Sequence, residues 1–258
     1  MGYLYLSAAH KSSGKTTLSI GLCAALAGAR GLTVQPFKKG PDYIDPLWLG
    51  AAAGRPCYNL DVYMESPAAN NRLFQSRMQG ADLGLIEGNK GLFDGISTDG
   101  SDSNAAMANL LGAPVVLVID TRGITRGIAP LLHGYATFDP EVQIAGVILN
   151  QVGGARHEAK LRKAVQTYTD IPVLGAVGRS SELVIDERHL GLMPSNEHEE
   201  AQRVISRIAH GVAEGVDLDS IMAVAAMAPA VPLGPAVPEL PSPDVTIGIA
   251  KDAAFGFY

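Results

Sequence analysis

The sequence predicts a doubly wound α/β domain, in which a mostly parallel sheet carries helices on both faces. Three observations support this fold class. Short apolar runs alternate with segments of helical spacing as far as residue 177. The runs are apolar throughout, as expected for strands that are buried on both faces of a sheet. A turn with the letters SSGKTT follows the first run and has the ending of a phosphate-binding loop.

Six apolar runs are expected to form the strands: residues 2–9, 32–38, 82–88, 114–120, 144–150 and 171–177. The first helix is expected from Thr16 to about Ala29, directly after the SSGKTT turn. Ligands of such sheets bind outside the carboxyl ends of the strands. The polar residues that follow each run are therefore the candidate functional residues.

The last part of the chain differs in composition from the rest. The stretch from Pro229 to Pro243 holds six of the 16 prolines, which cannot continue a helix and indicate an extended linker. We expect a main domain over residues 1–228, a linker over 229–243, and a further strand at the start of 244–258. One strand cannot fold alone, so it either pairs with the main sheet or begins a second domain.

Composition excludes several classes of function. The formal net charge is -6, the pI is near 5.5 and no basic run is present, which argues against nonspecific nucleic-acid binding. No apolar run reaches the length of a membrane span, and the N-terminus lacks the flanks of a signal peptide. Cys23 and Cys57 form neither a disulfide framework nor a metal-binding pair. We expect a cytoplasmic protein that binds neither nucleic acid nor membrane.

The SSGKTT turn departs from the usual pattern G-x-x-x-x-G-K-[ST], because Ala9 stands at the first glycine position. Alanine suffices there if the backbone angle is one that alanine adopts. Gly14 lets the backbone approach phosphates, Lys15 neutralises their charge, and the Thr16 hydroxyl is placed to hold Mg²⁺. The other expected nucleotide contacts in the turn are Ser12, Ser13 and Thr17. The alternative is a strand-to-helix turn without a ligand.

The second strand is followed by a loop with two lysines, Lys38 and Lys39, and two carboxylates, Asp42 and Asp45. Carboxylates beside a triphosphate act through a metal ion, since direct contact would be repulsive. The lysines suit a phosphate or a substrate carboxylate. A solvated turn built on glycine and proline explains the same letters equally well.

The third run ends in Glu87, and Asp94 follows seven positions later. An acidic side chain at the end of an apolar strand is costly unless it faces a cleft or a cation, so Glu87 is a candidate magnesium ligand. For Asp94 the simpler alternative is a capping carboxylate.

The fourth and fifth runs are also followed by polar residues. Asp120, Arg122 and Arg126 form a group in which the guanidinium forks suit substrate carboxylates, although an ordinary helix start also explains them. Asn150 carries an amide that suits a purine edge, or serves as a turn residue before two glycines.

As an ordered set, these loops closely resemble the cobyrinic acid a,c-diamide synthase family of glutamine-dependent amidoligases. The synthetase domain of that family is similar to dethiobiotin synthetase and has a P-loop NTPase-like fold. The resemblance extends over essentially the whole chain and includes VQPFKKGPDYIDP, EGNKGLFDG, LLGAPVVLVIDTRG and AGVILNQVGG. Members commonly lack the first glycine of the phosphate loop, as this chain does.

The resemblance implies a ligase that uses ATP and Mg²⁺ to convert an acetate side chain of a tetrapyrrole into an acyl phosphate, which ammonia then converts into an amide. The catalytic residues it implies are Lys15, Asp45, Glu87 and Asp94. Lys38 and Asn150 would join the turn in binding ATP, and the implied metal-site residues are Thr16, Asp42, Asp45 and Glu87. The implied substrate residues are Lys39, Tyr43, Asp94, Arg122 and Arg126.

Two departures bear on the reaction. Family members continue into a glutaminase domain with a cysteine nucleophile, which neither Cys23 nor Cys57 matches, and the sequence stops where that domain would begin. We therefore expect the ammonia to come from solution or from a separate glutaminase domain or partner, and a homodimer remains open. The letters EGNKGLFDG and TRGIAPLLHGY also look like the branch that amidates sirohaem.

Two other functions compete with amidation of a tetrapyrrole. One is a dethiobiotin synthetase-like ligase. The other is an ATP-switched partition protein, a class with a signature lysine five residues before the loop lysine, where this chain has His10.

Overall fold

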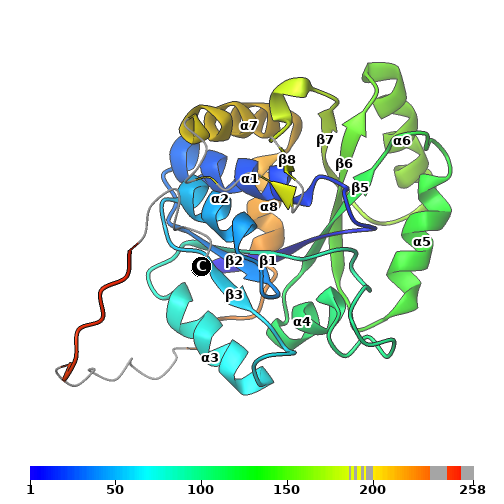
Figure 1. Ribbon diagram of the computed structural model, residues 1–258. Helices are drawn as coiled ribbons and strands as arrows, with labels where there is room; N and C mark the ends of the chain where they lie inside the picture. The colour runs from blue at the N-terminus through cyan, green and yellow to red at the C-terminus, as the bar shows by residue number, and fades with distance from the viewer. Residues whose placement is uncertain (186, 189–190, 193–194, 196–199, 233–242, 251–258) are drawn as a thin grey trace.

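The computed structural model describes residues 1–185, 187–188, 191–192, 195, 200–232 and 243–250. Its centre is a seven-stranded sheet with the strand order β3-β2-β4-β1-β5-β6-β7 (Figure 1). Every neighbouring pair in this sheet is parallel. The expected doubly wound α/β fold is confirmed.

All six expected strands are present close to their expected limits. They are β1 (Gly2–Ala8), β2 (Val34–Lys39), β4 (Leu83–Glu87), β5 (Val115–Asp120), β6 (Ile144–Val152) and β7 (Val173–Gly178). The edge strand β3 (Tyr58–Leu60) was not expected, because three residues are too few to show a periodic pattern. A separate antiparallel pair is formed by β8 (Glu187–Arg188) and β9 (Gly191–Leu192).

Helices cover both faces of the sheet (Figure 1). One face packs against α1 (Lys15–Arg30), α2 (Ile44–Ala53), α7 (Ala201–Gly215) and α8 (Leu218–Ala225). The other packs against α3 (Pro67–Met78), α4 (Asn104–Leu111), α5 (Ile128–Phe138) and α6 (Ala155–Tyr168). A short 3₁₀ helix, η1 (Ser181–Leu183), follows β7. Within the described residues no helix is long and apolar enough to cross a membrane.

The strands supply two cores by alternation of their side chains. Leu4 and Leu6 of β1 pack under α1, whereas Tyr3 and Tyr5 pack toward α3 and α4. All of them are buried, which explains why the runs are apolar throughout.

Parallel pairing brings the carboxyl ends of the strands to one edge. Lys38 of β2 is paired with Glu87 of β4, and Asp120 of β5 with Asn150 of β6. The loops that carry the candidate functional residues therefore meet along this edge, as expected.

The strand expected after residue 243 is not formed in residues 243–250, and residues 251–258 lie outside the described part of the chain. Val245, Ile247 and Ile249 are exposed, and among the described residues no strand pairs with this segment. Most of the expected linker, residues 233–242, is also outside the described residues. The domain boundaries stay a prediction.

Candidate active site

The phosphate loop (residues 9–16) connects β1 to α1 and has a backbone suited to anion binding. Gly14 is the N-cap of α1 and is left-handed (φ 86°), a conformation that favours glycine. A Cβ atom at Gly14 would also collide with the side chain of Asn150. Ala9 has no positive φ, so its backbone angle is one that alanine adopts. Ser12, by contrast, is left-handed (φ 63°) and strained.

The Lys15 ammonium crosses the loop to the segment after β4. Its Nζ donates to the Lys90 carbonyl at 2.6 Å, and the side chain is buried. Burial lowers the pKa of Lys15 to about 8, against the attraction of Glu87. Lys90 has a φ of 39°, which is uncommon for a residue with a side chain. Lys15 is thus held next to the N-terminus of α1, where a phosphate would bind.

Four side chains from different elements form a buried polar cluster beside Lys15. Lys38 Nζ lies 2.6 Å from Asp45 Oδ2 and 2.8 Å from Glu87 Oε1. The Thr16 hydroxyl donates to Glu87 Oε1 at 2.8 Å and lies 3.3 Å from Asp45 Oδ2. The structure therefore brings together the four residues Thr16, Lys38, Asp45 and Glu87, as the sequence predicted.

The cluster carries more negative than positive charge. Burial raises the pKa of Glu87, and the nearby ammonium of Lys38 opposes this rise. Burial lowers the pKa of Lys38, but the charges of Glu87, Asp45 and Asp42 together raise it above its usual value. One ammonium does not neutralise two carboxylates. The second oxygen of Glu87, Oε2, is buried and has no hydrogen-bond partner among the described residues.

This donor set suits a magnesium ion that is shared with a nucleotide. Two carboxylates and the Thr16 hydroxyl are all oxygen ligands, and Glu87 Oε2 is a buried oxygen available to a cation. Mg²⁺ takes its remaining ligands from phosphate and water, so a complete protein cage is not required. Consistently, the described residues contain no group of three His, Cys, Asp or Glu side chains that could hold a metal alone.

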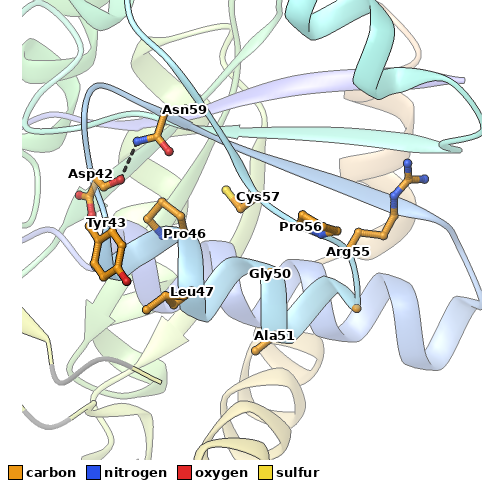
Figure 2. A pocket seen from close by; sticks show the side chains of 11 residues that line it. Asp42, Tyr43, Pro46, Leu47, Gly50, Ala51, Arg55, Pro56, Cys57 and Asn59 are labelled. Atoms are coloured by element: carbon orange, nitrogen blue, oxygen red, sulfur yellow. Dashed lines mark hydrogen bonds between the residues drawn. The ribbon is translucent and has the colours of Figure 1, made fainter. Parts of the chain in front are cut away.

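The loop after β2 is fixed by side-chain hydrogen bonds. Asp42 Oδ1 accepts from the backbone N–H groups of Ile44 and Asp45, and so supports the start of α2. The Asn59 amide donates to the carbonyls of Gly40 and Asp42, both at 2.6 Å, and Figure 2 shows the bond to Asp42. The other Asp42 oxygen lies 3.9 Å from Lys38 Nζ. Asp42 therefore borders the cluster, and its role at a metal stays a prediction.

A cleft of about 580 Å³ runs along α2 and the start of β3, with Asp42 and Tyr43 at one end and Arg55 at the other (Figure 2). Cys57 also lines this cleft. Cys57 is only half-buried, and its surroundings raise the pKa of the thiol, so the cysteine is a weak nucleophile. The substrate role of Tyr43 stays a prediction.

Lys39 lies on the opposite side of β2 from the cluster. Its Nζ donates to the Asp102 carbonyl at 2.5 Å. Burial lowers the pKa of Lys39. The charges of Asp102 and Asp61 raise this pKa, and the charge of Lys90 lowers it. The substrate role of Lys39 stays a prediction.

Asp94 is held close to the phosphate loop by a tight approach of two backbones. Its Oδ2 accepts from the Gly91 N–H at 2.9 Å. A Cβ atom at Gly91 would lie 2.7 Å from the Ala9 carbonyl, so only glycine fits without a shift. The charge of Asp94 also acts on the pKa of Lys15, which places both groups in one electrostatic environment.

The side chain of Asn104 holds the segment after β4 in place by hydrogen bonds, and the sequence analysis did not name this residue as a candidate. Its Oδ1 accepts from the Tyr5 hydroxyl and the Asn89 N–H, and its Nδ2 donates to the carbonyls of Asn89 and Gly91. The side chain is fully buried, so all four bonds are made away from water. A polar residue at the first position of a helix has many explanations, and no local pattern distinguishes this one.

The two arginines of the fourth loop lie apart from the buried cluster. Arg122 Nε and Nη2 donate to Asp120 Oδ2 at 2.9 and 2.5 Å, and Asp120 also accepts from the Arg122 backbone N–H. The expected alternative, a helix start at these residues, is wrong, because α5 begins at Ile128 and its N-cap is Gly127. Arg126 lies over the ring of Tyr168, 5.1 Å from its centre. The structure gives no support to a substrate role for either arginine, and both stay predictions.

Asn150 contacts the phosphate loop directly. Its Nδ2 donates to the Ser13 carbonyl at 2.8 Å, and the side chain is buried. The next residue, Gln151, is left-handed (φ 60°), so the chain turns sharply at this point. The position is next to the nucleotide site, whereas the reading of adenine stays a prediction.

Comparison with known proteins identifies related sequences. Residues 8–192 match the model of the family described as the CobQ/CobB/MinD/ParA nucleotide binding domain. The chain is 48% identical over 99% of its length to a cobyrinate a,c-diamide synthase of Magnetococcus marinus, and 43% identical over 99% to one of Dehalococcoides mccartyi. It is 45% identical over 86% of its length to a hydrogenobyrinate a,c-diamide synthase of Streptomyces coelicolor.

The chain spans about half the length of these curated relatives: 56% of the first two and 46% of the third. Among solved structures, it is similar to chloroplast FtsY of Physcomitrella patens, with a TM-score of 0.48 and 19% identity over 80% of this chain and 65% of the other.

Proposed function

Because the chain belongs to the CobQ/CobB/MinD/ParA nucleotide-binding domain family, we propose that it binds ATP with Mg²⁺ and uses it to amidate carboxylates of a tetrapyrrole. Bound ATP supplies the phosphoryl group that turns a carboxylate into an acyl phosphate, which ammonia converts to an amide with release of phosphate. The relatives that carry the names cobyrinate and hydrogenobyrinate a,c-diamide synthase support this substrate class.

The observation that carries the proposal is the buried cluster next to the phosphate loop. Lys15 lies beside the helix N-terminus that binds anions, and it neutralises phosphate oxygens there. Thr16, Asp45 and Glu87 would hold the Mg²⁺, with Glu87 Oε2 already without a hydrogen-bond partner. These groups stabilise charge that develops on a transferring phosphoryl group, which is the main requirement of such a reaction.

The substrate carboxylate that is activated would bind on the other side of the phosphate loop. We assign Lys39, at the carboxyl end of β2, to this carboxylate, and the charge of Lys90 acts on the pKa of Lys39. A carboxylate held there is oriented towards the phosphate loop, and orientation supplies a large part of catalysis between two bound reactants. The ammonia would come from solution or from a glutaminase domain or partner subunit.

A panel of substrates tests this function. The chain is incubated with ATP, MgCl₂ and ammonium chloride, and with cobyrinate, sirohydrochlorin or diaminopelargonate in turn. We expect ADP release and formation of a primary amide, identified by mass spectrometry, with cobyrinate or sirohydrochlorin, and neither product in the Lys15→Ala or Glu87→Ala variants, which remain folded. Turnover of diaminopelargonate alone would instead indicate a dethiobiotin synthetase-like ligase.

A second readout separates an enzyme from a nucleotide switch. If ATP caused the chain to dimerise while none of the three acids was phosphorylated, the proposal would be wrong and a partition-type function would be favoured. Full turnover by either variant would remove the assignment of the site.

A further inference from the structure

An apolar groove on the other side of the phosphate loop has no part in the chemistry described above. It has a volume of about 390 Å³ and lies between α5 and the segment after β4. The residues that line it are Phe93, Pro130, Leu131, Gly134, Tyr135 and Phe138. Phe138 is 74% exposed, which is unusual for a large aromatic side chain. The groove therefore presents an aromatic surface to the solvent.

Three rings form this surface. The ring centres of Phe93 and Tyr135 are 5.4 Å apart with an angle of 34° between planes, and those of Phe93 and Phe138 are 4.8 Å apart with an angle of 58°. These separations are typical of aromatic rings in contact. The rings support one another, so their positions are defined although one of them is exposed.

Tyr135 connects the groove to the phosphate loop. Its hydroxyl donates to the Ala9 carbonyl, the first position of the loop. Burial raises the pKa of Tyr135, and the nearby charge of Asp94 raises it further. The charge of Asp94 also acts on the pKa of Lys15.

We propose that this groove binds one face of the tetrapyrrole macrocycle, with Phe93, Tyr135 and Phe138 as the residues that contact it. The inference rests on the proposed function. A large flat apolar ring with carboxylates at its edge needs an apolar surface that ends at the site of phosphoryl transfer. The groove meets both conditions, because Phe138 is exposed, Phe93 and Tyr135 are half-buried beside it, and Tyr135 reaches the phosphate loop. A short aliphatic acid would leave Phe138 in water.

Gly134 allows a test that does not disturb the fold. A Cβ atom there meets no atom within 4 Å, and the residue lies in α5, so a larger side chain would enter the groove without a clash. Gly28 of α1 is also exposed and also has nothing within 4 Å. Gly28→Leu is therefore a matched control for Gly134→Leu, and leucine favours a helix more than glycine does in both places.

The experiment measures binding of cobyrinate to the full chain by its visible absorbance, without nucleotide, and binding of ATP separately. We expect Gly134→Leu and Phe138→Ala to weaken cobyrinate binding by about tenfold, because stacking contacts are lost or blocked. ATP affinity should stay within about twofold of wild type in both, which also shows that they are folded. Two control variants should bind cobyrinate as the wild type does. They are Gly28→Leu and Met227→Ala, and Met227 is an exposed apolar residue after α8.

The outcomes distinguish the two proposals. If the wild-type chain binds cobyrinate and both groove variants bind it equally well, the groove is not the macrocycle site, although the proposed function stands. If the wild-type chain binds neither cobyrinate nor sirohydrochlorin, the proposed function fails and the groove proposal fails with it.

Discussion

The Lys38 ammonium donates to the Glu87 carboxylate at 2.8 Å, and only 3% and 0% of these side chains are exposed to solvent. The two residues lie opposite each other on the paired strands β2 and β4. A buried carboxylate without a counter-charge is costly, so Lys38 supplies the positive charge that the cluster needs before a metal ion binds.

Lys38→Met should therefore destabilise the protein. We expect the free energy of unfolding at pH 8 to fall by roughly 3 kcal/mol, because Glu87 and Asp45 lose their cation. Without Lys38, the folded-state pKa of Glu87 rises further above its unfolded value, so the loss of stability should be smallest in acid and grow as the pH rises. Urea denaturation across pH 5–8 measures both effects.

A double variant is the control for this prediction. Lys38→Met combined with Glu87→Gln removes the ammonium together with one of its two carboxylates, and should recover part of the stability. A Lys38→Met protein as stable as wild type at pH 8 would contradict the prediction.

The second prediction concerns pH and nucleotide affinity. The pKa of Lys15 is lowered by burial to about 8, and a bound triphosphate favours the charged ammonium. Nucleotide binding should therefore take up a proton above pH 8, and ATP affinity should be constant below about pH 7 and fall as the pH rises through 8. Calorimetry at pH 8.5 in two buffers with different heats of ionisation measures the proton uptake.

Lys15→Arg is the matched variant, because arginine stays charged across this range. Its affinity for ATP should show no comparable decrease with pH. The free chain should also gain stability as the pH rises from about 8 towards 10.5, since the folded-state pKa lies below the usual value and the unfolded state then binds more protons. Absence of proton uptake by the wild type would show that Lys15 is already fully charged.

Gly91→Ala tests the close approach of the two loops. The added methyl group would lie 2.6 Å from Asp94 Oδ2 and 2.7 Å from the Ala9 carbonyl, so Asp94 must move. If Asp94 has the proposed catalytic role, turnover should fall by about 100-fold, because a small displacement of a catalytic group has a large effect on rate, and ATP affinity should fall less, through the shift of the Ala9 carbonyl. Gly28→Ala, where the methyl group meets nothing within 4 Å, is the control. Normal turnover by Gly91→Ala would exclude a catalytic role for the position of Asp94.

Asn150→Ala separates two roles of one side chain. If the amide only supports the Ser13 carbonyl, affinities for ATP and GTP should fall by the same factor. If it also reads adenine, as we predict, ATP should lose about tenfold more affinity than GTP. Competition binding with the two nucleotides measures the ratio, and Lys15→Met, which acts on phosphates alone, should leave that ratio unchanged.

Much of the fold was predictable because its signals are local. The runs that became β1, β2, β4, β5, β6 and β7 are apolar over their whole length, and SSGKTT marks the turn into α1. The edge strand β3 was missed, because Tyr58–Leu60 pairs with β2 only and shows no period. Residues 243–250 form no strand in the described part of the chain, and the expected further strand stays a prediction.

The site was predictable in part for the same reason. Thr16, Lys38, Asp45 and Glu87 end strands or begin helices at one edge, and the structure joins them. Arg126 also follows a strand, yet it lies over Tyr168. Position after a strand indicates the edge on which a residue lies, whereas the direction of a long side chain depends on which neighbour packs against it.

The amino-acid sequence alone predicted the parallel sheet, the turn with the letters of a phosphate loop, and the edge of the sheet on which the candidate site residues lie. These features were predictable because hydrophobic periodicity and turn residues are local signals that extend over a few residues. The sequence alone did not contain the buried pair of Lys38 and Glu87, 49 positions apart, or the bond from Tyr135 to Ala9 across 126 positions. Those contacts exist because β4 lies between β2 and β1 in the sheet and α5 packs across the opposite face. Strand order and helix packing depend on the tertiary structure of the whole chain, and they determine which residues that are distant in the sequence come into contact.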